Sequence, residues 1–400
     1  MPHERIRHLE SLLRKSLRFS PLVGILGHRQ VGKTTLAQKI GTDYLTMDLK
    51  PNATSAELDA VGFLDNHSGR PLVLDECQLV PELFPALKEY VRTKKNPGQF
   101  LLTGSVRFTS RKAIRESLTG RIINWDLLPM DVAETLGRKL SEIIPKALSA
   151  RNVEFELPSA KTNITSLMEQ YLIRGGLPGV FAVRDSAIRS QRFETQLETL
   201  LDRDLRLVSD TSLDFGPLRA LAQYLARNQG MPFDYSKASR SIRITPITIR
   251  KLLAAFESIF LIRTLASEGS ERKSSIFFED QGEASHLNPA SGSKSEDFDR
   301  FLFANLRTQL NYRPQLRGTI TQYRNRGGAF IPFIIRTPKT ALAIHPILEE
   351  NPGKQAIMSA ISFLKKNSSG KVLYVTPSKK DLVLAKNQRI IPASVLLGID

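Results

Sequence analysis

The first 135 residues alternate short apolar runs with amphipathic stretches. The apolar runs predict strands over Leu22–Leu26, Tyr44–Leu49, Pro71–Asp75, Gln99–Thr103 and Arg121–Leu127. Helices are predicted over Lys33–Ile40, Ser55–Leu64 and Glu82–Thr93. Strands that alternate with helices indicate a parallel sheet covered on both faces. The pattern therefore predicts an α/β domain over residues 1–135.

Beyond Asp131 the pattern becomes mainly helical. Helices are predicted over residues 163–173, 187–208, 215–228, 235–242 and 246–260, followed by a short apolar run at Ile276–Phe278. The segment Asn288–Asp297 is rich in serine, glycine and charge, which is typical of a mobile linker. We therefore expect a helical region over residues 136–287.

The last block of the chain returns to a mixed pattern. After a helix that begins near Phe298, strands are predicted at Thr319–Tyr323, Ala329–Ile335, Thr340–His345 and Val372–Val375, with a helix at Lys354–Lys366. The pattern predicts a small α/β domain over residues 288–400.

The composition suits a globular protein of two to three domains. The chain has 400 residues, of which 41% are hydrophobic and 24% charged, close to the averages for globular proteins. Its single cysteine, Cys77, excludes an internal disulfide and a multi-cysteine zinc site. No apolar run approaches the roughly 18 residues of a membrane helix, and the start of the chain resembles an amphipathic helix rather than a signal peptide. We expect a cytoplasmic protein with no membrane partner.

The positive charge is concentrated after the first domain. Residues 1–135 carry 19 Lys and Arg against 15 Asp and Glu, whereas the remainder carries 38 against 25, a net charge of +13. An excess of this size suggests an anionic partner, most simply nucleic acid. A basic surface without a specific ligand would also account for it.

A phosphate-binding motif follows the first predicted strand. The run Gly27-His-Arg-Gln-Val-Gly32-Lys33-Thr34 fits G-x-x-x-x-G-K-[ST], and a predicted helix follows it, which is the context that the motif requires. The lysine should reach the β- and γ-phosphates of ATP, and the threonine hydroxyl should bind Mg²⁺. The predicted nucleotide-binding residues are Gly27, His28, Arg29, Gln30, Val31, Gly32, Lys33, Thr34 and Thr35.

Two acids end the strand at Leu72-Val-Leu-Asp75-Glu76. Together with Thr34, Asp75 can hold Mg²⁺, and Glu76 can polarise the attacking water. The strand that ends at Thr103-Gly104-Ser105 offers hydroxyls to the γ-phosphate or the water, although these residues could instead cap a turn.

Several runs carry a family resemblance. DECQLVPELFPALKEYV, GQFLLTGS and ESLTGRIINWDLLPMDVAE resemble prokaryotic AAA+-type ATPases, in which a P-loop domain precedes a C-terminal domain of uncharacterised function. The resemblance implies Walker A at Gly27–Thr34, Walker B at Asp75 with Glu76 as base, and a sensor at Thr103–Ser105. It implies that Arg121 is a γ-phosphate arginine, although Arg121 could equally pair with a carboxylate.

The resemblance continues into the helical region, at Tyr171-Leu-Ile-Arg-Gly175-Gly176-Leu-Pro178-Gly and at Leu200-Leu-Asp-Arg-Asp204. We interpret the first of these as a rigid turn between helices.

Three short helices over residues 218–262, which end in Ile259-Phe-Leu-Ile-Arg-Thr-Leu265, look like a winged helix-turn-helix. Thr245 is a plausible N-cap with Pro246 in the first helical position. The basic residues that could face DNA are Arg240, Arg243, Arg250 and Lys251. A helical packing module with solvated basic residues is the alternative.

In the family, the last block resembles a PD-(D/E)XK nuclease core. Asp299 could stand for its first acid, but Phe330-Ile331-Pro332 occupies the E-V-D segment and His345-Pro346-Ile347 occupies E-V-K. Because proline and isoleucine cannot hold the metal or transfer a proton, we expect a nuclease-like fold without nuclease activity.

The sequence thus predicts a Mg-dependent ATPase that couples its nucleotide state to a basic, DNA-binding C-terminal region. A homo-oligomer is possible. The alternative is a nucleotide-controlled interaction or sensor protein with little turnover and no DNA binding.

Overall fold

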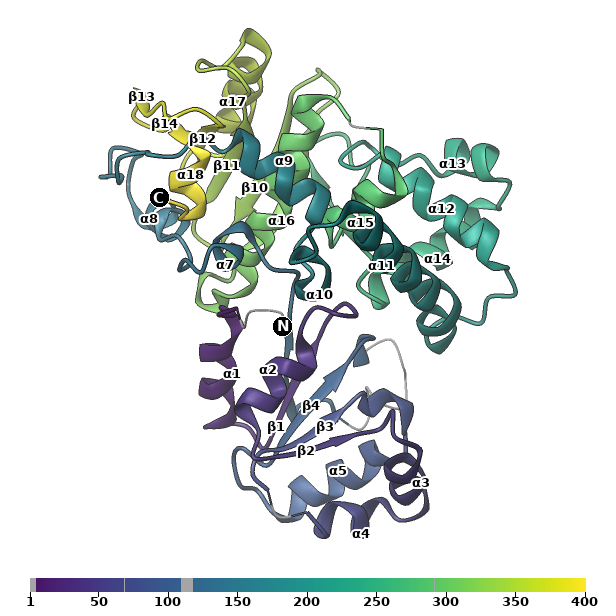
Figure 1. Cartoon of the computed structure of the whole chain (residues 1–400). Coiled ribbons are helices and arrows are strands. Elements are labelled where there is room, and N and C mark those ends of the chain that lie inside the picture. The colour runs from purple at the N-terminus through teal and green to yellow at the C-terminus, as the bar shows by residue number, and fades with distance from the viewer. Residues whose placement is uncertain (1–4, 68, 109–117, 291) are drawn as a thin grey trace.

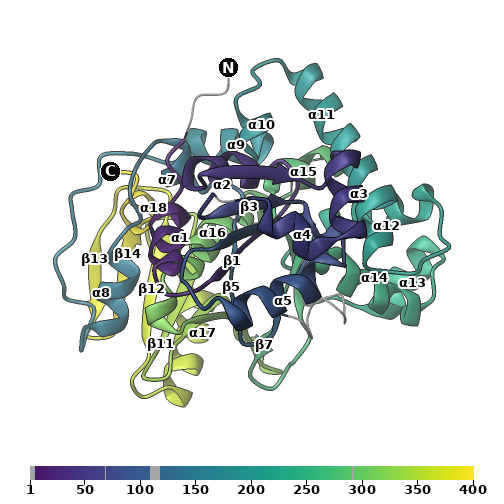
Figure 2. The same cartoon turned by 90° about the horizontal axis from the view of Figure 1, so that it is seen from below.

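The structure is a computed structural model that describes residues 5–67, 69–108, 118–290 and 292–400. The N-terminal part forms the lower domain in Figure 1, and the rest of the chain forms a larger upper mass. Seen from below, the C-terminal strands and the helices α12–α14 lie on opposite sides of the N-terminal domain (Figure 2). No described helix combines the length and apolar character needed to cross a membrane.

The N-terminal domain is built on a five-stranded sheet in the order β2-β3-β4-β1-β5, in which every pairing is parallel. Its strands are β1 (Leu22–Leu26), β2 (Asp43–Thr46), β3 (Leu72–Asp75), β4 (Phe100–Gly104) and β5 (Ile122–Asp126). Its main helices are α1 (Leu9–Leu17), α2 (Lys33–Ile40), α3 (Lys50–Leu58), α4 (Ala60–Asp65) and α5 (Leu83–Thr93). The predicted α/β domain with a parallel sheet is confirmed.

Both faces of this sheet are buried, because successive side chains of a strand point to opposite faces. Val23 and Ile25 of β1 pack with α1 and α2, whereas Leu22 and Leu26 pack on the side of α4 and α5. The short continuous apolar runs of the sequence are therefore strands with two covered faces.

Two predicted elements of this domain differ from the observed ones by more than one residue at an end. The strand predicted to reach Leu49 ends at Thr46, because α3 begins at Lys50 with Pro51 in its first turn. The helix predicted over Ser55–Leu64 is two helices, because the Asp59 side chain accepts a hydrogen bond from Gly62 N and so starts α4.

The middle of the chain is helical. Its elements include α9 (Thr165–Arg174), α10 (Pro178–Phe181), α11 (Ser186–Glu198), α12 (Phe215–Arg227), α13 (Tyr235–Ile242), α14 (Pro246–Ser258) and α15 (Gln281–Leu287). A two-stranded antiparallel sheet of β6 (Ile262–Leu265) and β8 (Ser275–Phe278) packs into the core that α12–α14 share. The helix predicted over 187–208 is not a single α-helix. Helix α11 is followed by a π-helical turn, Thr199–Asp204, and then by a 3₁₀ turn, Leu205–Leu207.

The C-terminal part contains a seven-stranded mixed sheet in the order β13-β14-β12-β11-β10-β9-β7. Its strands are β7 (Ser267–Glu268), β9 (Thr319–Arg324), β10 (Phe330–Arg336), β11 (Ala341–Pro346), β12 (Lys371–Thr376), β13 (Leu382–Ala385) and β14 (Gln388–Pro392). Helix α17 (Lys354–Lys366) packs on one face, and α16 (Lys294–Asn311) and α18 (Ala393–Leu397) on the other. The sequence patterns do not predict β13, β14 and α18.

The end of the segment predicted as a linker before this sheet belongs to helix α16 (Lys294–Asn311). Helix α16 begins at Lys294 rather than near Phe298, because Ser293 and Glu296 form a capping box. The Ser293 side chain accepts from Glu296 N, and the Glu296 carboxylate accepts from Ser293 N at 2.8 Å.

The cores do not follow the chain in sequence order. Helices α8 (Ile143–Ser149) and α9 share one hydrophobic core with α16 and the C-terminal sheet. The division at residues 136 and 288 stays a prediction, and this shared core shows that residues 143–174 contribute to the C-terminal packing.

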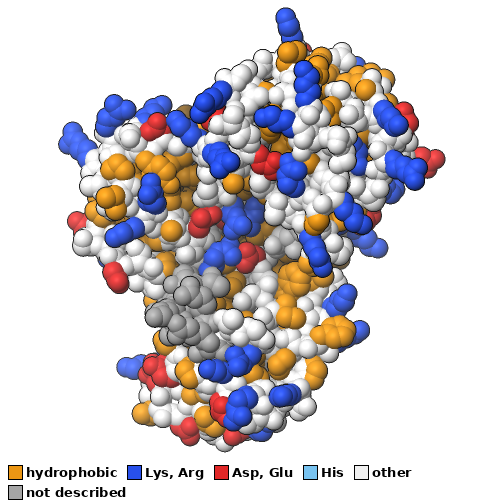
Figure 3. Space-filling view, turned by 180° about the vertical axis from the view of Figure 1, so that it is seen from behind, with side chains coloured by type: hydrophobic (Ala, Val, Ile, Leu, Met, Phe, Trp, Pro, Cys, Tyr) orange, Lys and Arg blue, Asp and Glu red, His pale blue; other side chains and the backbone are white. Residues whose placement is uncertain are grey.

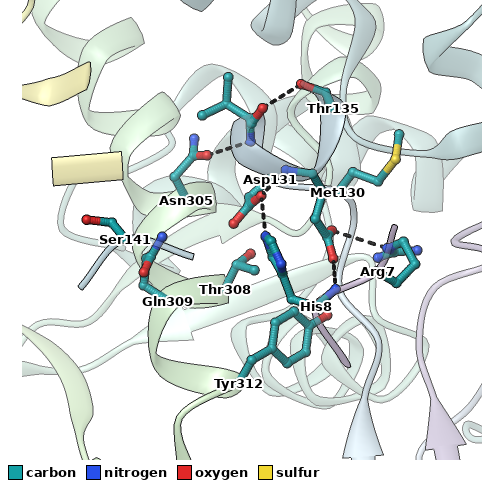
Figure 4. Close-up of polar contacts among 12 residues, drawn as sticks. Arg7, His8, Met130, Asp131, Thr135, Ser141, Asn305, Thr308, Gln309 and Tyr312 are labelled. Atoms are coloured by element: carbon teal, nitrogen blue, oxygen red, sulfur yellow. Dashed lines mark hydrogen bonds and ion pairs between the residues drawn. The ribbon is translucent and has the colours of Figure 1, made fainter. Parts of the chain in front are cut away.

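A buried polar cluster joins the N-terminal arm, residues 5–8 before α1, to the rest of the molecule (Figure 4). His8 Nε2 lies 3.5 Å from Asp131, and Asn305 of α16 accepts a hydrogen bond from Val132 N in α7 (Val132–Thr135). Burial would lower the pKa of His8, but the Asp131 carboxylate raises it overall. The cluster fixes the start of the chain against α7 and α16.

The turn between α9 and α10 is packed against backbone. Gly176 N donates to Asp280 Oδ2 at 2.6 Å, and Gly176 O accepts from Met130 N at 2.7 Å. A Cβ added at Gly176 would lie 2.2 Å from the Met130 carbonyl oxygen. The predicted rigid turn therefore depends on the absence of a side chain here.

Gly176→Ala is expected to destabilise the protein by roughly 2–3 kcal/mol, since an atom forced into packed surroundings costs energy of this order. Thermal unfolding should show a clearly lower Tm. The matched control is Gly216→Ala in α12, where an added Cβ meets nothing within 4 Å and where alanine is the better helix former by about 1 kcal/mol. Equal Tm values for the two variants would contradict this account of the turn.

Candidate nucleotide-binding site

The motif loop lies at the carboxyl edge of the parallel sheet, between β1 and α2. Gly32 has φ +96° and caps α2 in a left-handed conformation that glycine adopts without strain. Gln30 also has a positive φ, +57°. The loop borders a cleft of about 620 Å³ that Lys33, Thr34, Thr35 and Gln30 help to line.

The Lys33 ammonium is held by the loop itself. Its Nζ donates to Gly27 O and His28 O, both at 2.9 Å. The side chain is buried, and this burial lowers the pKa of Lys33. An anionic group that entered the loop would therefore favour the charged form of this lysine.

Asp75 ends β3 and accepts hydrogen bonds from three hydroxyls. Thr34 Oγ1 donates to Asp75 Oδ2 at 2.9 Å, Tyr44 OH donates to the same oxygen at 2.6 Å, and Thr103 Oγ1 donates to Oδ1. The hydroxyl of Thr34 and the carboxylate of Asp75 are oxygen donors of the kind that Mg²⁺ prefers. These residues fit a magnesium ion shared with phosphate oxygens.

Glu76 follows in a left-handed conformation, with φ +53°. Its N–H donates to Thr103 Oγ1 at 3.2 Å, and its Oε2 accepts from Ser105 Oγ at 3.2 Å and from Gln78 Nε2. The strained backbone is fixed by β4, so that Glu76 and Asp75 both border the cleft.

Comparison with known sequences identifies the N-terminal part. Residues 20–136 match the AAA domain family, and these residues contain the whole arrangement of Lys33, Thr34, Asp75 and Glu76. The match supports a P-loop ATPase domain in this part of the chain. Residues 165–289 match a domain of unknown function, DUF8612.

Two curated relatives are themselves uncharacterised. Rv2008c of Mycobacterium tuberculosis and Mb2031c of Mycobacterium bovis are each 27% identical to this chain over 285 residues. The match covers 69% of this chain and 58% of each relative, so that the chain spans little more than half of their length.

Among solved structures, the chain is similar to the Walker-type ATPase PABY2304 of Pyrococcus abyssi. The identity is 16% and the TM-score 0.41, over 70% of this chain and 94% of the other. A STAND protein with a tetratricopeptide repeat sensor, PH0952 from Pyrococcus horikoshii, gives 13% identity and a TM-score of 0.27, over 79% of this chain and 50% of the other. These scores are too low to support an argument about this chain.

Two predicted binding residues of the ATPase domain turn away from the cleft. The side chain of Val31 is buried in the core, and Val31 O accepts from Arg7 Nη1 at 2.6 Å. His28 is buried too, with Nε2 3.0 Å from Glu283 Oε2 of α15. Burial would lower the pKa of His28, but the Glu283 carboxylate raises it overall. The side chains of Val31 and His28 are therefore not available to a ligand in the cleft.

Arg121 lies at the wrong edge of the sheet for action within its own chain. It directly precedes β5, whose Ile122 pairs with Leu22 at the start of β1, whereas the P-loop follows Leu26 at the other end. The two edges are about 15 Å apart along the strands. Arg121 Nη1 donates to Thr119 O, and the residue does not line the cleft. A role toward a phosphate bound by a neighbouring subunit stays a prediction.

Several residues that line the cleft were not predicted from the sequence, and some of them come from distant segments. Arg7 comes from the N-terminal arm, and Pro178 and Gly179 come from α10, which follows the glycine-rich turn. The turn itself was visible in the sequence, but nothing local indicated that it packs beside the P-loop. Arg7 is one of several arginines near the N-terminus, and nothing in the sequence distinguishes it as a residue of the cleft.

The nuclease-like positions carry no clustered metal ligands. In the described part of the chain, no three His, Cys, Asp or Glu side chains form a metal-binding group. Pro332 and Ile347 are buried at the positions of the expected acid and lysine. Burial lowers the pKa of His345 to about 4 and raises that of Asp299 to about 8, so both are mostly neutral at pH 7.

Proposed function

We propose that this protein binds Mg-ATP, hydrolyses it slowly and couples the state of the nucleotide to DNA binding by its C-terminal region. The observation that carries the proposal is the convergence of Lys33, Thr34, Asp75 and Glu76 on one cleft of the ATPase domain. The single cysteine suits a reducing cytoplasm, where we place the protein.

Each of the four site residues has its own role in binding or hydrolysis. Lys33 exchanges its loop carbonyls for phosphate oxygens, and the Gly32–Thr34 amides at the start of α2 meet the negative charge. Thr34 and Asp75 would hold Mg²⁺, which would neutralise charge on the phosphates when bound. Glu76 accepts a proton from the attacking water. Its carboxylate is already hydrogen-bonded by Ser105 and Gln78, which supports slow turnover.

A winged helix-turn-helix is our proposal for the DNA-binding element. Helices α12, α13 and α14 share a core with the two-stranded antiparallel sheet of β6 and β8. Thr245 caps α14, accepting from Thr248 N at 3.2 Å, and Pro246 is in its first turn. Arg250 and Lys251 are exposed on α14, and Arg240 and Arg243 are exposed beside it. The arrangement allows basic side chains to meet phosphates.

On the face that Figure 3 shows, the surface charge by itself does not locate a DNA site. Figure 3 shows Lys and Arg side chains at many points of the upper mass, without one continuous patch. The exposed basic residues of α13 and α14 are the feature that favours this location.

For the terminal sheet we propose a nuclease-like fold without nuclease activity. Helix α16, strand β10 and strand β11 occur in this order along the chain, with β9 between α16 and β10, and this order supports the resemblance. The buried Pro332 and Ile347 leave this sheet without the acid and lysine that cleavage needs.

A protein partner is the second candidate, and one observation favours it. Ile247 on the outer face of α14 is 71% exposed, between the basic residues Arg243 and Arg250. An exposed apolar side chain in this position would suit a protein surface. A homo-oligomer, in which Arg121 acts on a neighbour, is compatible with either candidate.

The DNA proposal is tested with the double variant Arg250→Ala/Lys251→Ala. We expect labelled duplex DNA to bind the unaltered protein with an affinity that falls steeply with salt, because each phosphate contact releases counterions. The double variant should bind roughly tenfold more weakly, and its salt slope should be smaller by about two. Fluorescence anisotropy across a salt series, with and without ATP, measures both.

The matched control removes the same charge elsewhere, with Lys365→Ala/Lys366→Ala at the exposed end of α17. If both double variants lose the same affinity, the charge acts without a site on α14. Absent or salt-insensitive binding would favour the protein-partner candidate.

A further inference from the structure

Arg29 is a charged residue of the P-loop that its motif does not require. It lies two residues after Gly27, and its side chain lines the same cleft as Lys33 and Glu76. The carboxylates that act on Arg29 are Asp204 first and then Glu76 and Asp48. Arg29 and Glu76 therefore line one cleft, in which the terminal phosphate must meet the attacking water.

The partner of Arg29 is a buried carboxylate of the helical region. Arg29 Nε donates to Asp204 Oδ2 at 2.7 Å, and the Asp204 side chain is only 1% exposed. Its other oxygen, Oδ1, has no hydrogen-bond partner among the residues that the structure describes. A buried carboxylate with a single cationic partner holds that partner firmly, because separating them would leave a buried charge unpaired.

The guanidinium keeps donors for a second anion. An arginine has five N–H donors in a planar fork, and in the described residues the side-chain hydrogen bond of Arg29 uses only Nε. The side chain is 24% exposed toward the cleft. Its two Nη groups can therefore bind phosphate oxygens while Nε remains on Asp204.

Asp204 connects the P-loop to the helical region of the chain. It closes the π-helical turn Thr199–Asp204, and π turns inside helices are uncommon and frequent at functional sites. Leu200, Leu201 and Leu205 flank it and pack in the core that also holds Leu252 and Phe256 of α14. A displacement of this turn would therefore reach the proposed DNA-binding helices.

We propose that Arg29 binds the γ-phosphate while it remains paired with Asp204, so that ATP tightens the contact between the P-loop and the π-helical turn and ADP does not. This inference rests on the proposed binding of ATP. It assigns to Arg29 the role of a γ-phosphate ligand within the same chain. Arg121 does not fit this role within its own chain, because it lies at the opposite edge of the sheet. Asp204 is the positioning residue.

The first test compares the affinities of Mg-ADP and the non-hydrolysable analogue Mg-AMP-PNP. We expect the unaltered protein to prefer AMP-PNP by tenfold or more, a difference of the size of charge-assisted hydrogen bonds to phosphate. Arg29→Ala should lose this preference while its ADP affinity stays within about twofold. Isothermal titration calorimetry measures both affinities.

Arg29→Ala leaves Asp204 buried without its partner and could fail to fold. The double variant Arg29→Gln/Asp204→Asn removes both charges together and should show the same loss of preference. The matched control is Arg206→Ala, which removes an exposed arginine two residues beyond Asp204 that pairs with Asp202. This control should keep the preference.

The second test separates binding from coupling. With AMP-PNP instead of ADP, amide hydrogen exchange of residues 199–207 should slow in the unaltered protein. In Asp204→Asn the analogue should still bind, but exchange in this segment should no longer depend on the nucleotide. Equal exchange with both nucleotides in the unaltered protein would overturn the coupling.

The outcomes distinguish this inference from the proposed function. If the unaltered protein binds neither nucleotide, the proposed ATP binding fails and the inference with it. If it binds both and the charge-removed double variant keeps the AMP-PNP preference, only the inference fails. Equal losses for ADP and AMP-PNP would show that Arg29 merely shapes the loop, and would also overturn it.

Discussion

Replacing Lys33 with alanine is expected to abolish measurable ATP binding, with a loss of affinity on the order of a hundredfold or more. The lysine is the charged donor of the loop, and charge-assisted hydrogen bonds to phosphate are each worth about 1.5–3 kcal/mol. Its Nζ lies within the loop and donates hydrogen bonds to Gly27 O and His28 O. A bound phosphate would therefore replace these two acceptors, and the lysine would not have to move into the loop. Titration with a fluorescent ATP analogue measures the loss.

The alanine variant also leaves two loop carbonyls without their donor. Lys33→Met, which keeps most of the side-chain volume, is therefore measured in parallel, and circular dichroism with thermal unfolding checks the fold of both. Lys88→Ala removes an exposed lysine of α5 as the matched control. Unchanged ATP affinity in a folded Lys33→Ala protein would contradict the assignment of the loop.

The N-terminal domain was predictable because its signals are local. Strand β1 and helix α2 have the predicted boundaries, and the motif between them places Lys33 and Thr34 without knowledge of the rest of the chain. Asp75 and Glu76 follow from the rule that carboxyl ends of parallel strands share one edge of the sheet. The same rule places Arg121 at the other edge, because it precedes its strand instead of following it.

The remainder of the site depends on contacts between distant parts of the chain. Arg7, Gly179 and Asp204 reach the P-loop from the N-terminal arm, from α10 and from the π-helical turn. Each is set by tertiary packing, and none is marked by spacing or periodicity. Asp204 was noted in the sequence only as part of a resemblance, and its partner Arg29 only as a motif position.

Packing between distant segments also explains the elements that the sequence analysis missed at the end of the chain. Strand β13 is exposed along its whole length and pairs only with β14, so that burial imposes no alternating pattern on it. Helix α18 is short and buried on all sides, and it packs against α8, which is more than two hundred residues earlier. Short segments of these kinds have no helical or strand period to recognise.

The second large effect is expected from Glu76→Gln, which should bind ATP with nearly unchanged affinity and hydrolyse it 10²- to 10⁴-fold more slowly, the contribution typical of a general base. The amide keeps the size of the carboxylate, and its oxygen can still accept from Ser105 Oγ and Gln78 Nε2. The left-handed backbone at this position is held by Thr103 and does not depend on the carboxylate charge. What the variant loses is the ability to take a proton from water.

Phosphate release under single-turnover conditions measures this step, and a binding titration with ATP checks that the site is filled. Glu89→Gln makes the same chemical change at an exposed position of α5, where the carboxylate pairs with Arg92, and should turn over ATP at the unaltered rate. Because Asp75 already accepts three hydroxyl hydrogen bonds, it has little capacity left to replace Glu76 as the base. A Glu76→Gln protein that retains more than a tenth of the unaltered rate would therefore show that the proton leaves the water by another route, and that the carboxylate of Glu76 serves the site in some other way.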